Sequence, residues 1–285
     1  MDKFIDLHMH TFYSDGEYSP DTLVKMAIYK NISTMSITDH DTLEGIKKVN
    51  RNDKYIRDSG ITIYNGIELS AKVKTGRMHI LGYDIDLDNK VLNNKMIEFK
   101  NNSTNTTLSL IEQMKKDYNI MFSHEDLKEL LNANHNLGRI DVAKLLIKNG
   151  YVKTVDEAFT KYMNSSYEKI FHLKKGKLYP ECIELIKNAN GIPVLAHPKS
   201  LKKSNEELIS LLEDMIDLGL MGIEVYHSSH TKEEMDYYLE LANKYNLLVS
   251  GGSDYHGPIA KPNVELGKLK IKQLSIVDYI NKRSH

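Results

Sequence analysis

Cysteine is almost absent from this chain of 285 residues, where Cys182 stands alone. A single thiol cannot form a disulfide within the chain, so a framework of disulfides is excluded. The scarcity is typical of proteins in a reducing compartment, and a cytoplasmic location is expected.

Long apolar runs are lacking as well. No stretch approaches the roughly 18 apolar residues that a membrane-spanning helix requires, so no contact with a membrane is expected. Asp2 and Asp6 interrupt the apolar residues near the start of the chain, and no secretory signal peptide is expected there.

An excess of charge of one sign is also missing. Lys and Arg number 38 and Asp and Glu 39, which gives a net charge of −1. The whole molecule is therefore not expected to attract nucleic acid, although a local basic patch stays possible. Hydrophobic residues at 41% and charged residues at 27% are typical of a globular protein. The length fits one barrel-sized domain with an insertion, or two domains.

Strands and helices are predicted to alternate over most of the sequence. Helices are expected between the strands; one of them has Ser19 as its N-cap and Pro20 in its first turn. This order is typical of parallel βαβ units, hence of an α/β fold. The predicted strands cover residues 4–7, 34–38, 61–69, 78–85, 192–196, 222–226 and 247–250.

The middle of the chain has a different character. Six asparagines lie between residues 89 and 107, and no strand is predicted from there to about residue 180. Helical spacing resumes at Leu108 and again at Ile140. We therefore expect a barrel formed by residues 1–88 and 181–285, with a small all-helical insertion at 89–180. Because the insertion lies between His79 and His197, it is expected to cover the active site.

Polar residues mark the end of nearly every predicted strand. In a parallel barrel the carboxyl ends of the strands meet at one face, where active sites are built. His79 is the exception, because it lies within its strand. The strand-end residues are His8, His10, His40, Glu68, His197, His227, Asp254 and His256.

Each of these residues alone fits a structural role, such as a hydrogen-bonded histidine, a helix cap or a turn. Together they favour a metal site. His8 and His10 are two residues apart on a strand, so their side chains point to the same face, and Asp254 and His256 repeat that spacing. Unpaired polar groups of this density would destabilise the fold, and a metal cluster pairs them. Nitrogen and oxygen ligands without thiolate suit Zn, Mn or Fe(II).

The motifs of the chain resemble those of the PHP (polymerase and histidinol phosphatase) phosphoesterases. Gly138-Arg139 and the segment Glu224 to His227 further resemble the stand-alone nucleotide phosphatases and 5′-3′ exoribonucleases of that family. The resemblance implies a distorted (β/α)7 barrel with two to three divalent metal ions. It is carried by His8-Met9-His10, Asp15-Gly16, Thr38 to Asp41, Glu68 with His79 to Tyr83, Ala196 to Pro198, and Ser253 to Gly257.

The same resemblance implies which residues hold the metals. A first ion is expected on His8, His10, Glu68 and Asp254. Glu68 would bridge to a second ion, completed by His79 and His197. A third ion is expected on Asp15, His40 and His256. The full set argues against an inactive relative. Glu68, Asp254 and His227 are the expected catalytic residues.

Arg139 and His227 are the expected substrate-binding residues, because both suit contact with phosphate. The nucleotide-specific subgroup usually has a histidine two residues after the arginine, where this chain has Asp141. Lys169, Lys174, Lys175 and Lys177 form either a solvated loop or a basic edge that guides phosphates.

The predicted function is hydrolysis of a phosphate ester on a nucleotide-like substrate by metal-activated water. A nucleoside 3′,5′-bisphosphate or a short 5′-phosphorylated oligonucleotide would offer two phosphate groups, one for the metals and one for Arg139. The partner is then a small phosphorylated molecule or a single-stranded RNA end. The alternatives are a histidinol-phosphate phosphatase and a non-catalytic metal-binding module.

Overall fold

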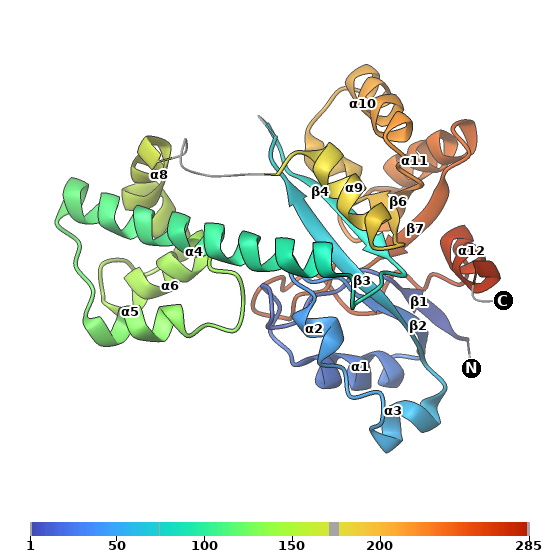
Figure 1. Cartoon of the computed structure of the whole chain (residues 1–285), viewed down its shortest axis with the longest axis horizontal. Coiled ribbons are helices and arrows are strands. Elements are labelled where there is room, and N and C mark those ends of the chain that lie inside the picture. The colour runs from blue at the N-terminus through green and yellow to red at the C-terminus, as the bar shows by residue number, and fades with distance from the viewer. Residues whose placement is uncertain (1, 74, 171–176, 284–285) are drawn as a thin grey trace. The chain divides into compact units, whose positions relative to one another are not determined.

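The computed structural model describes residues 2–73, 75–170 and 177–283 and divides into two compact units (Figure 1). Unit 1 comprises Met1–Asn94 with Lys177–His285, and unit 2 comprises Lys95–Gly176. The predicted boundaries at 88 and 181, and the predicted covering of the active site by the insertion, stay predictions.

Unit 1 is built on one seven-stranded sheet whose strands are neighbours in chain order. The Leu7 amide donates to the Gly251 carbonyl at 3.1 Å, and the Asp254 amide donates to the His8 carbonyl at 2.8 Å. These bonds join the first strand to the last, and the predicted α/β barrel is confirmed. The strands are β1 Phe4–Asp6, β2 Ile32–Ile37, β3 Thr62–Ala71, β4 Met78–Tyr83, β5 Ile192–Leu195, β6 Gly222–His227 and β7 Leu248–Gly252.

Strand β4 departs from the parallel pattern. It pairs antiparallel with β3 and with β5, whereas the other neighbouring strands run parallel. The connection from β3 to β4 is only a few residues long, which suits a hairpin and not a helical crossover. The first residues of β4 therefore lie at the barrel end where the parallel strands finish.

The helices of unit 1 connect the strands. The predicted cap of α1 is present, since the Ser19 hydroxyl accepts a bond from the Thr22 amide at 3.2 Å. The helices are α1 Pro20–Tyr29, α2 Glu44–Lys47, α3 Lys54–Ser59, α9 Tyr179–Asn188, η3 Pro198–Leu201, α10 Asn205–Asp217, α11 Lys232–Lys244 and α12 Ser275–Arg283. Helix α4 spans Lys90–Tyr118, so it begins in unit 1 and continues into unit 2.

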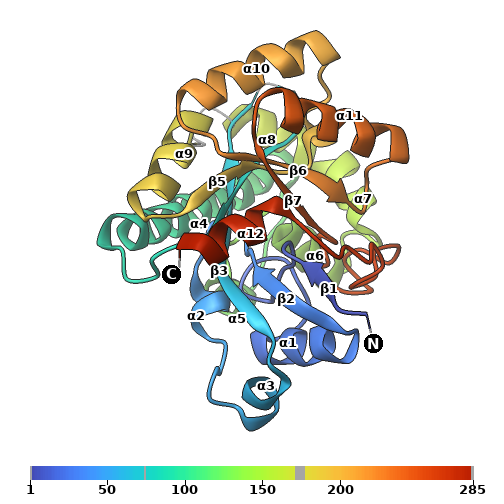
Figure 2. The ribbon, with the colours of Figure 1, turned by 90° about the vertical axis from the view of Figure 1, so that its right-hand side faces the viewer.

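Apolar side chains fill the barrel end where the parallel strands begin. Ile5 of β1, Tyr83 of β4 and Ile192 of β5 belong to this core. Ile276 and Ile280 of α12 are fully or almost fully buried in the same cluster, and Figure 2 shows α12 lying in front of the strands. One end of the barrel is thus sealed by hydrophobic packing, which leaves the other end for chemistry.

Unit 2 consists of helices in the part that the structure describes. Leu110 and Met114 of α4 pack against Val142 and Leu146 in a core of their own. Besides the larger part of α4, the unit contains α5 His124–Leu131, α6 Arg139–Lys148, α7 Val155–Ala158, η1 Phe159–Met163 and α8 Asn164–Ile170.

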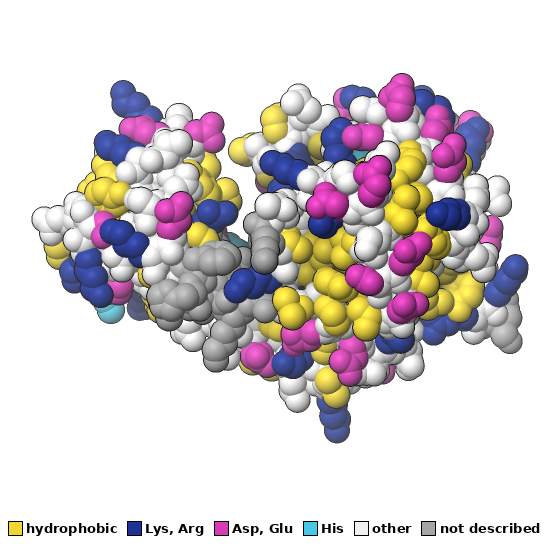
Figure 3. All heavy atoms as spheres, turned by 90° about the horizontal axis from the view of Figure 1, so that it is seen from above, with side chains coloured by type: hydrophobic (Ala, Val, Ile, Leu, Met, Phe, Trp, Pro, Cys, Tyr) yellow, Lys and Arg dark blue, Asp and Glu magenta, His cyan; other side chains and the backbone are white. Residues whose placement is uncertain are grey.

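Charged side chains of both signs are interspersed on the face drawn in Figure 3, in keeping with the near-zero net charge of the chain. Among the helices that the structure describes, none combines the length and the apolar character needed to cross a membrane.

Candidate metal centre

The predicted ligands gather at the barrel end opposite α12. Their donor atoms form groups in which all atoms lie within 4.8 Å of one another. The groups are His8, His10, Glu68 and Asp254; His40, Glu68 and His79; and His10, Asp15, His40 and His256. The sequence thus brings together residues from strands and loops along the whole barrel.

The carboxylate of Glu68 lies at the middle of the cluster, with a side chain that is fully buried. Its Oε2 atom lies 3.1 Å from His8, 3.2 Å from His10 and 3.2 Å from His40. Its Oε1 atom lies 2.8 Å from His79 Nδ1 and 2.9 Å from His197 Nε2. Each oxygen therefore faces its own set of imidazoles, the arrangement expected of a bridging carboxylate.

Strand β4 supplies His79 because it runs antiparallel. His79 is the second residue of β4 and is paired with Ser70 of β3. In a parallel strand this position would lie toward the opposite end of the barrel. The reversal explains why His79 seemed an exception in the sequence and yet belongs to the same site.

Asp254 completes the group around the first predicted ion. Its Oδ1 atom lies 3.2 Å from His10 Nε2, 3.5 Å from His8 Nε2 and 3.4 Å from His256 Nδ1. The φ angle of Asp254 is 56°, in the left-handed region that is uncommon outside glycine. A residue stays in this region only where the surrounding structure stabilises it.

Asp15 lies at the solvent-exposed edge of the centre. Its Oδ1 atom lies 3.2 Å from His256 Nε2 and 3.6 Å from His10 Nδ1, and its Oδ2 atom lies 3.8 Å from His40 Nε2. The side chain of Asp15 is 54% exposed, whereas that of Glu68 is fully buried. Asp15 is therefore the predicted ligand whose side chain is most exposed.

The donor set fits divalent ions. His10 Nε2 is buried and makes no hydrogen bond within the described structure, although Glu68 Oε2 and Asp254 Oδ1 both lie 3.2 Å away. Donor atoms that share one ion at about 2.0–2.2 Å lie roughly 3.0–3.6 Å from one another. A buried imidazole nitrogen between two carboxylate oxygens at that separation is suited to metal binding and not to hydrogen bonding.

The pKa shifts keep the Glu68 carboxylate ionised, whereas the imidazoles of the centre differ from one another. Burial raises the pKa of Glu68, but the nearby His40, His8 and His79 outweigh it and hold that pKa well below its usual range. Burial lowers the pKa of His79 to about 4. Burial also lowers the pKa of His8 and of His10, but the nearby carboxylates outweigh it and raise both pKa values, so a metal ion must displace protons there. Ionised carboxylates and neutral imidazoles are the forms that bind a metal ion.

Glu224 of β6 contacts the centre, although sequence analysis assigned it no role beyond a shared motif. It is fully buried, and its Oε1 atom accepts a bond from His8 Nδ1 at 2.8 Å. Its Oε2 atom accepts a bond from the His197 amide at 2.7 Å. The first bond requires a proton on His8 Nδ1, so Nε2, which faces Glu68 and Asp254, is the ring nitrogen that remains for a metal ion. One signal in the sequence could have revealed this role. Glu224 is an acidic residue within an apolar strand, where an unpaired buried charge would destabilise the fold.

His227 ends β6 and is a hydrogen-bond donor toward the centre. The Ser229 amide donates to His227 Nδ1 at 3.1 Å, so the ring proton resides on Nε2. That Nε2–H group lies 3.2 Å from Asp254 Oδ2. His8, Glu224 and His227 also lie within reach of one another. His8 Nδ1 and His227 Nε2 donate protons in these bonds and Glu224 accepts one, so the three residues form a hydrogen-bonded network beside the predicted ligands.

Arg139 lies in unit 2, as the first residue of α6. Its guanidinium group lies 5.0 Å from the ring centre of Phe159 and 4.7 Å from that of Tyr167, so two cation–π contacts hold it. Asp141 accepts a bond from the Gly138 amide at 2.8 Å and lies 2.8 Å from His135 Nε2. Asp141, which stands where the nucleotide-specific subgroup has a histidine, thus contacts a histidine from another position, His135.

The lysines near residue 170 are only partly described. Lys169 Nζ lies 2.5 Å from Asp117 Oδ1, and Lys177 Nζ lies 2.6 Å from Asp41 Oδ1. Lys174 and Lys175 lie outside the described residues. The two described lysines therefore have carboxylate partners within their own units.

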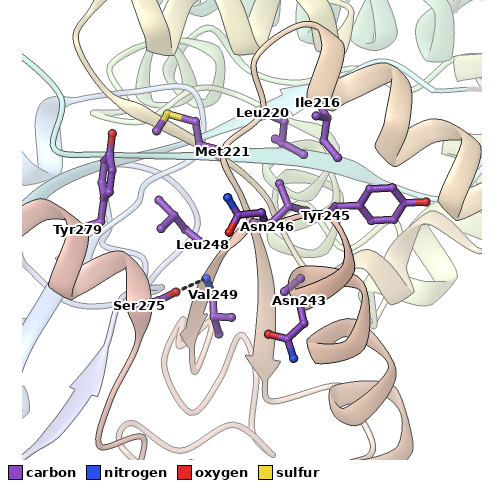
Figure 4. Close-up of a pocket in the computed structure, with 12 residues that line it drawn as sticks. Ile216, Leu220, Met221, Asn243, Tyr245, Asn246, Leu248, Val249, Ser275 and Tyr279 are labelled. Atoms are coloured by element: carbon purple, nitrogen blue, oxygen red, sulfur yellow. Dashed lines mark hydrogen bonds between the residues drawn. The ribbon is translucent and has the colours of Figure 1, made fainter.

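A pocket of about 660 Å³ lies away from the metal centre (Figure 4). Met221 lines it just before β6 and Leu248 at the start of β7, so it lies at the end where the parallel strands begin. The Ser275 hydroxyl accepts a bond from the Val249 amide at 2.8 Å in its wall. Its lining residues include no histidine and no carboxylate, and it offers no metal ligands.

Comparison with known proteins matches the PHP domain family model over residues 6–249. The chain is 27% identical over 280 residues to a 5′-3′ exoribonuclease of Haemophilus influenzae, covering 98% of this chain and 97% of that protein. It is 25% identical over 254 residues to a 3′,5′-nucleoside bisphosphate phosphatase of Chromobacterium violaceum, covering 89% and 87%. Its structure resembles that of a Bifidobacterium adolescentis protein described as a metal-dependent phosphoesterase, with a TM-score of 0.75 and 27% identity over 98% and 95% of the two chains.

Proposed function

This chain belongs to the PHP domain family, and from that premise we propose that it is a metal-dependent phosphoesterase acting on a nucleotide-like substrate. The observation that carries the proposal is the buried Glu68 carboxylate, whose two oxygens each face a separate set of imidazoles. Relatives that align with nearly the whole chain are named as an exoribonuclease and a nucleoside bisphosphate phosphatase. A nucleoside 3′,5′-bisphosphate or the 5′-phosphorylated end of a short single-stranded RNA is the proposed substrate.

Two to three divalent ions, Mn, Zn or Fe, are the proposed cofactors. His8, His10, Glu68 and Asp254 would hold the first, and Glu68, His79 and His197 the second. The third would lie on Asp15, His40 and His256, where the donor atoms are more exposed. Bound ions of this kind supply a hydroxide nucleophile near neutral pH and withdraw electron density from the phosphoryl group.

The protein's own groups orient the ester and move the proton. His227 presents an Nε2–H group beside Asp254, so it would donate a hydrogen bond to a phosphoryl oxygen, and a protonated histidine at the edge of the centre would supply the proton of the leaving oxygen. Arg139, fixed between Phe159 and Tyr167, would bind a second phosphate of the substrate through its planar donors. A nucleotide substrate and the single buried Cys182 both suit the proposed cytoplasmic location.

The deciding experiment is a substrate panel on one Mn-loaded preparation. It compares kcat/KM for a nucleoside 3′,5′-bisphosphate, a short 5′-phosphorylated RNA, AMP and histidinol phosphate. We expect the bisphosphate or the RNA to be hydrolysed fastest. If histidinol phosphate is preferred by tenfold, about 1.4 kcal/mol of transition-state stabilisation, the nucleotide assignment fails and the histidinol-phosphatase alternative replaces it. If none is hydrolysed, the non-catalytic alternative replaces both.

A further inference from the structure

Lys261 brings an ammonium group to the edge of the metal centre. Its Nζ atom is hydrogen-bonded to Asp254 Oδ2, the same oxygen that lies 3.2 Å from His227 Nε2. The other oxygen of Asp254 faces the imidazoles of His8, His10 and His256. Two proton donors therefore converge on the side of Asp254 that points away from the predicted ligands.

The lysine is also accessible. Its side chain is 34% exposed, whereas the side chains of His227 and Asp254 are 5% and 10% exposed. The ammonium group thus lies between the buried network and solvent, where an incoming ligand can contact it.

The loop that carries Lys261 is held in place by Glu17. Glu17 Oε1 accepts bonds from the amides of Ile259 at 2.6 Å and Ala260 at 2.5 Å. The Glu17 amide in turn donates to the His256 carbonyl at 2.8 Å, and the Lys261 amide donates to the Gly257 carbonyl at 2.9 Å. A carboxylate two residues after Asp15 therefore fixes the position from which Lys261 reaches the centre.

Gly257 permits this close packing. Its φ angle is 110°, and a Cβ atom there would lie 2.5 Å from Glu17 Cδ. Any other residue would strain the backbone and displace the Glu17 carboxylate.

We propose that Lys261 and His227 together form a subsite for a phosphoryl oxygen of the substrate. The inference rests on the proposed phosphoesterase function and adds Lys261 to its substrate-binding residues. Once the charge of Asp254 is offset by metal coordination, the Lys261 ammonium group is available to an anion. Lys261 supplies an ammonium donor and His227 an Nε2–H donor, a combination suited to the dianion of a phosphate monoester.

The test measures the binding of inorganic phosphate to the metal-loaded, full-length protein by titration calorimetry. Metal content is determined on the same samples by elemental analysis. We expect Lys261→Gln to weaken phosphate binding by about tenfold or more, and Lys261→Arg to retain most of the affinity. Metal content should be unchanged in both. Lys268→Gln is the matched control, since Lys268 follows on the same loop and pairs with Glu265 at 3.4 Å; it should bind phosphate as the wild type does.

Lys261→Gln protein that binds phosphate with wild-type affinity would overturn the proposal and leave Lys261 as a counterion of Asp254 alone. A loss of phosphate binding that only follows a loss of metal would overturn it too. Glu17→Ala gives an independent check, because releasing the loop should weaken phosphate binding while Lys261 is still present. Phosphate binding is read without turnover, so a wild-type protein that hydrolyses no substrate would refute the proposed function and leave this comparison intact.

Discussion

His79 Nδ1 lies 2.8 Å from Glu68 Oε1, and the two residues come from neighbouring antiparallel strands. The contact exists because β4 reverses direction and starts at the barrel end where β1, β2, β5, β6 and β7 finish. It gives Glu68 a second set of partners, so its carboxylate would be shared by the first and second proposed ion sites.

Glu68→Ala should therefore remove more than one metal equivalent, because both oxygens of the carboxylate are lost at once. Turnover should fall by about a thousandfold or more, roughly 4 kcal/mol. Asp15→Ala affects only the exposed set and should leave two equivalents. Elemental analysis after loading with Mn measures both. Wild-type metal content in the Glu68→Ala protein would exclude a bridging role.

Glu224→Gln should lower metal affinity by about 10–100-fold, the usual effect of removing an acid that orients a ligating histidine. The neutral amide no longer enforces a proton on His8 Nδ1, so His8 Nε2 is less often available. Competition with a chromophoric chelator gives the affinity. Asp39→Asn is the control, because Asp39 is equally buried but bonds to Thr11 and Ser14. Equal losses in the two variants would point to a general effect of removing a buried charge.

His230 should make stability depend on pH. Its Nδ1 atom bonds to the Val225 carbonyl at 2.9 Å, and burial lowers its pKa to about 4. The unfolded chain binds a proton to this residue near pH 6.5, so stability is fully present above that pH. About 3 kcal/mol is then lost as the pH falls from 6.5 to 4.

Denaturant unfolding of metal-free protein across this pH range measures the effect of His230. The wild type should lose more stability on acidification than His230→Gln, which carries no titrating group at this position. Parallel pH profiles would show that His230 does not titrate as described. The metal ligands titrate in both proteins, so the difference between the profiles isolates His230.

Arg139→Ala should remove most of the preference for a bisphosphate over AMP, about tenfold in kcat/KM, or 1.4 kcal/mol. AMP lacks the second phosphate and should be hydrolysed at the wild-type rate. Lys144→Ala is the control, since Lys144 is an exposed residue of the same helix. If the Arg139→Ala protein kept the preference for the bisphosphate over AMP, Arg139 would have no role in substrate recognition.

The barrel and the grouping of the polar side chains could be predicted because strands end where polar residues begin. His8, His40 and His227 each follow an apolar run, and the carboxyl ends of parallel strands meet at one face. The direction of β4 could not be predicted, because alternation along a strand is the same whichever way it runs. Only the pairing of Ser70 with His79 reveals it.

The first part of helix α4, before Leu108, escaped prediction for a different reason. This part contains the asparagines at 93, 94, 101, 102 and 105. Asparagine has a low helix propensity, so the sequence does not indicate a helix there. The inward positions Ser103 and Thr107 are small and polar, so they conceal the helical spacing that Leu110 and Met114 continue. The Ser103 hydroxyl bonds to the Leu137 carbonyl, and Thr107 is almost fully buried. Tertiary contacts of this kind leave no periodic apolar signal in the sequence.

The junction between β1 and β7 also determines when the centre can exist during synthesis. Leu7 is bonded to Gly251 and His8 to Asp254, so the ring of strands closes only after the ribosome has made both partners. At about 5–20 residues per second, the His8 and His10 pair precedes Asp254 by roughly 10–50 s. During that interval the nascent chain presents the two histidines, and later Glu68, without the Asp254 that completes their set. Correct metal loading is therefore a late event, which follows translation of almost the entire barrel.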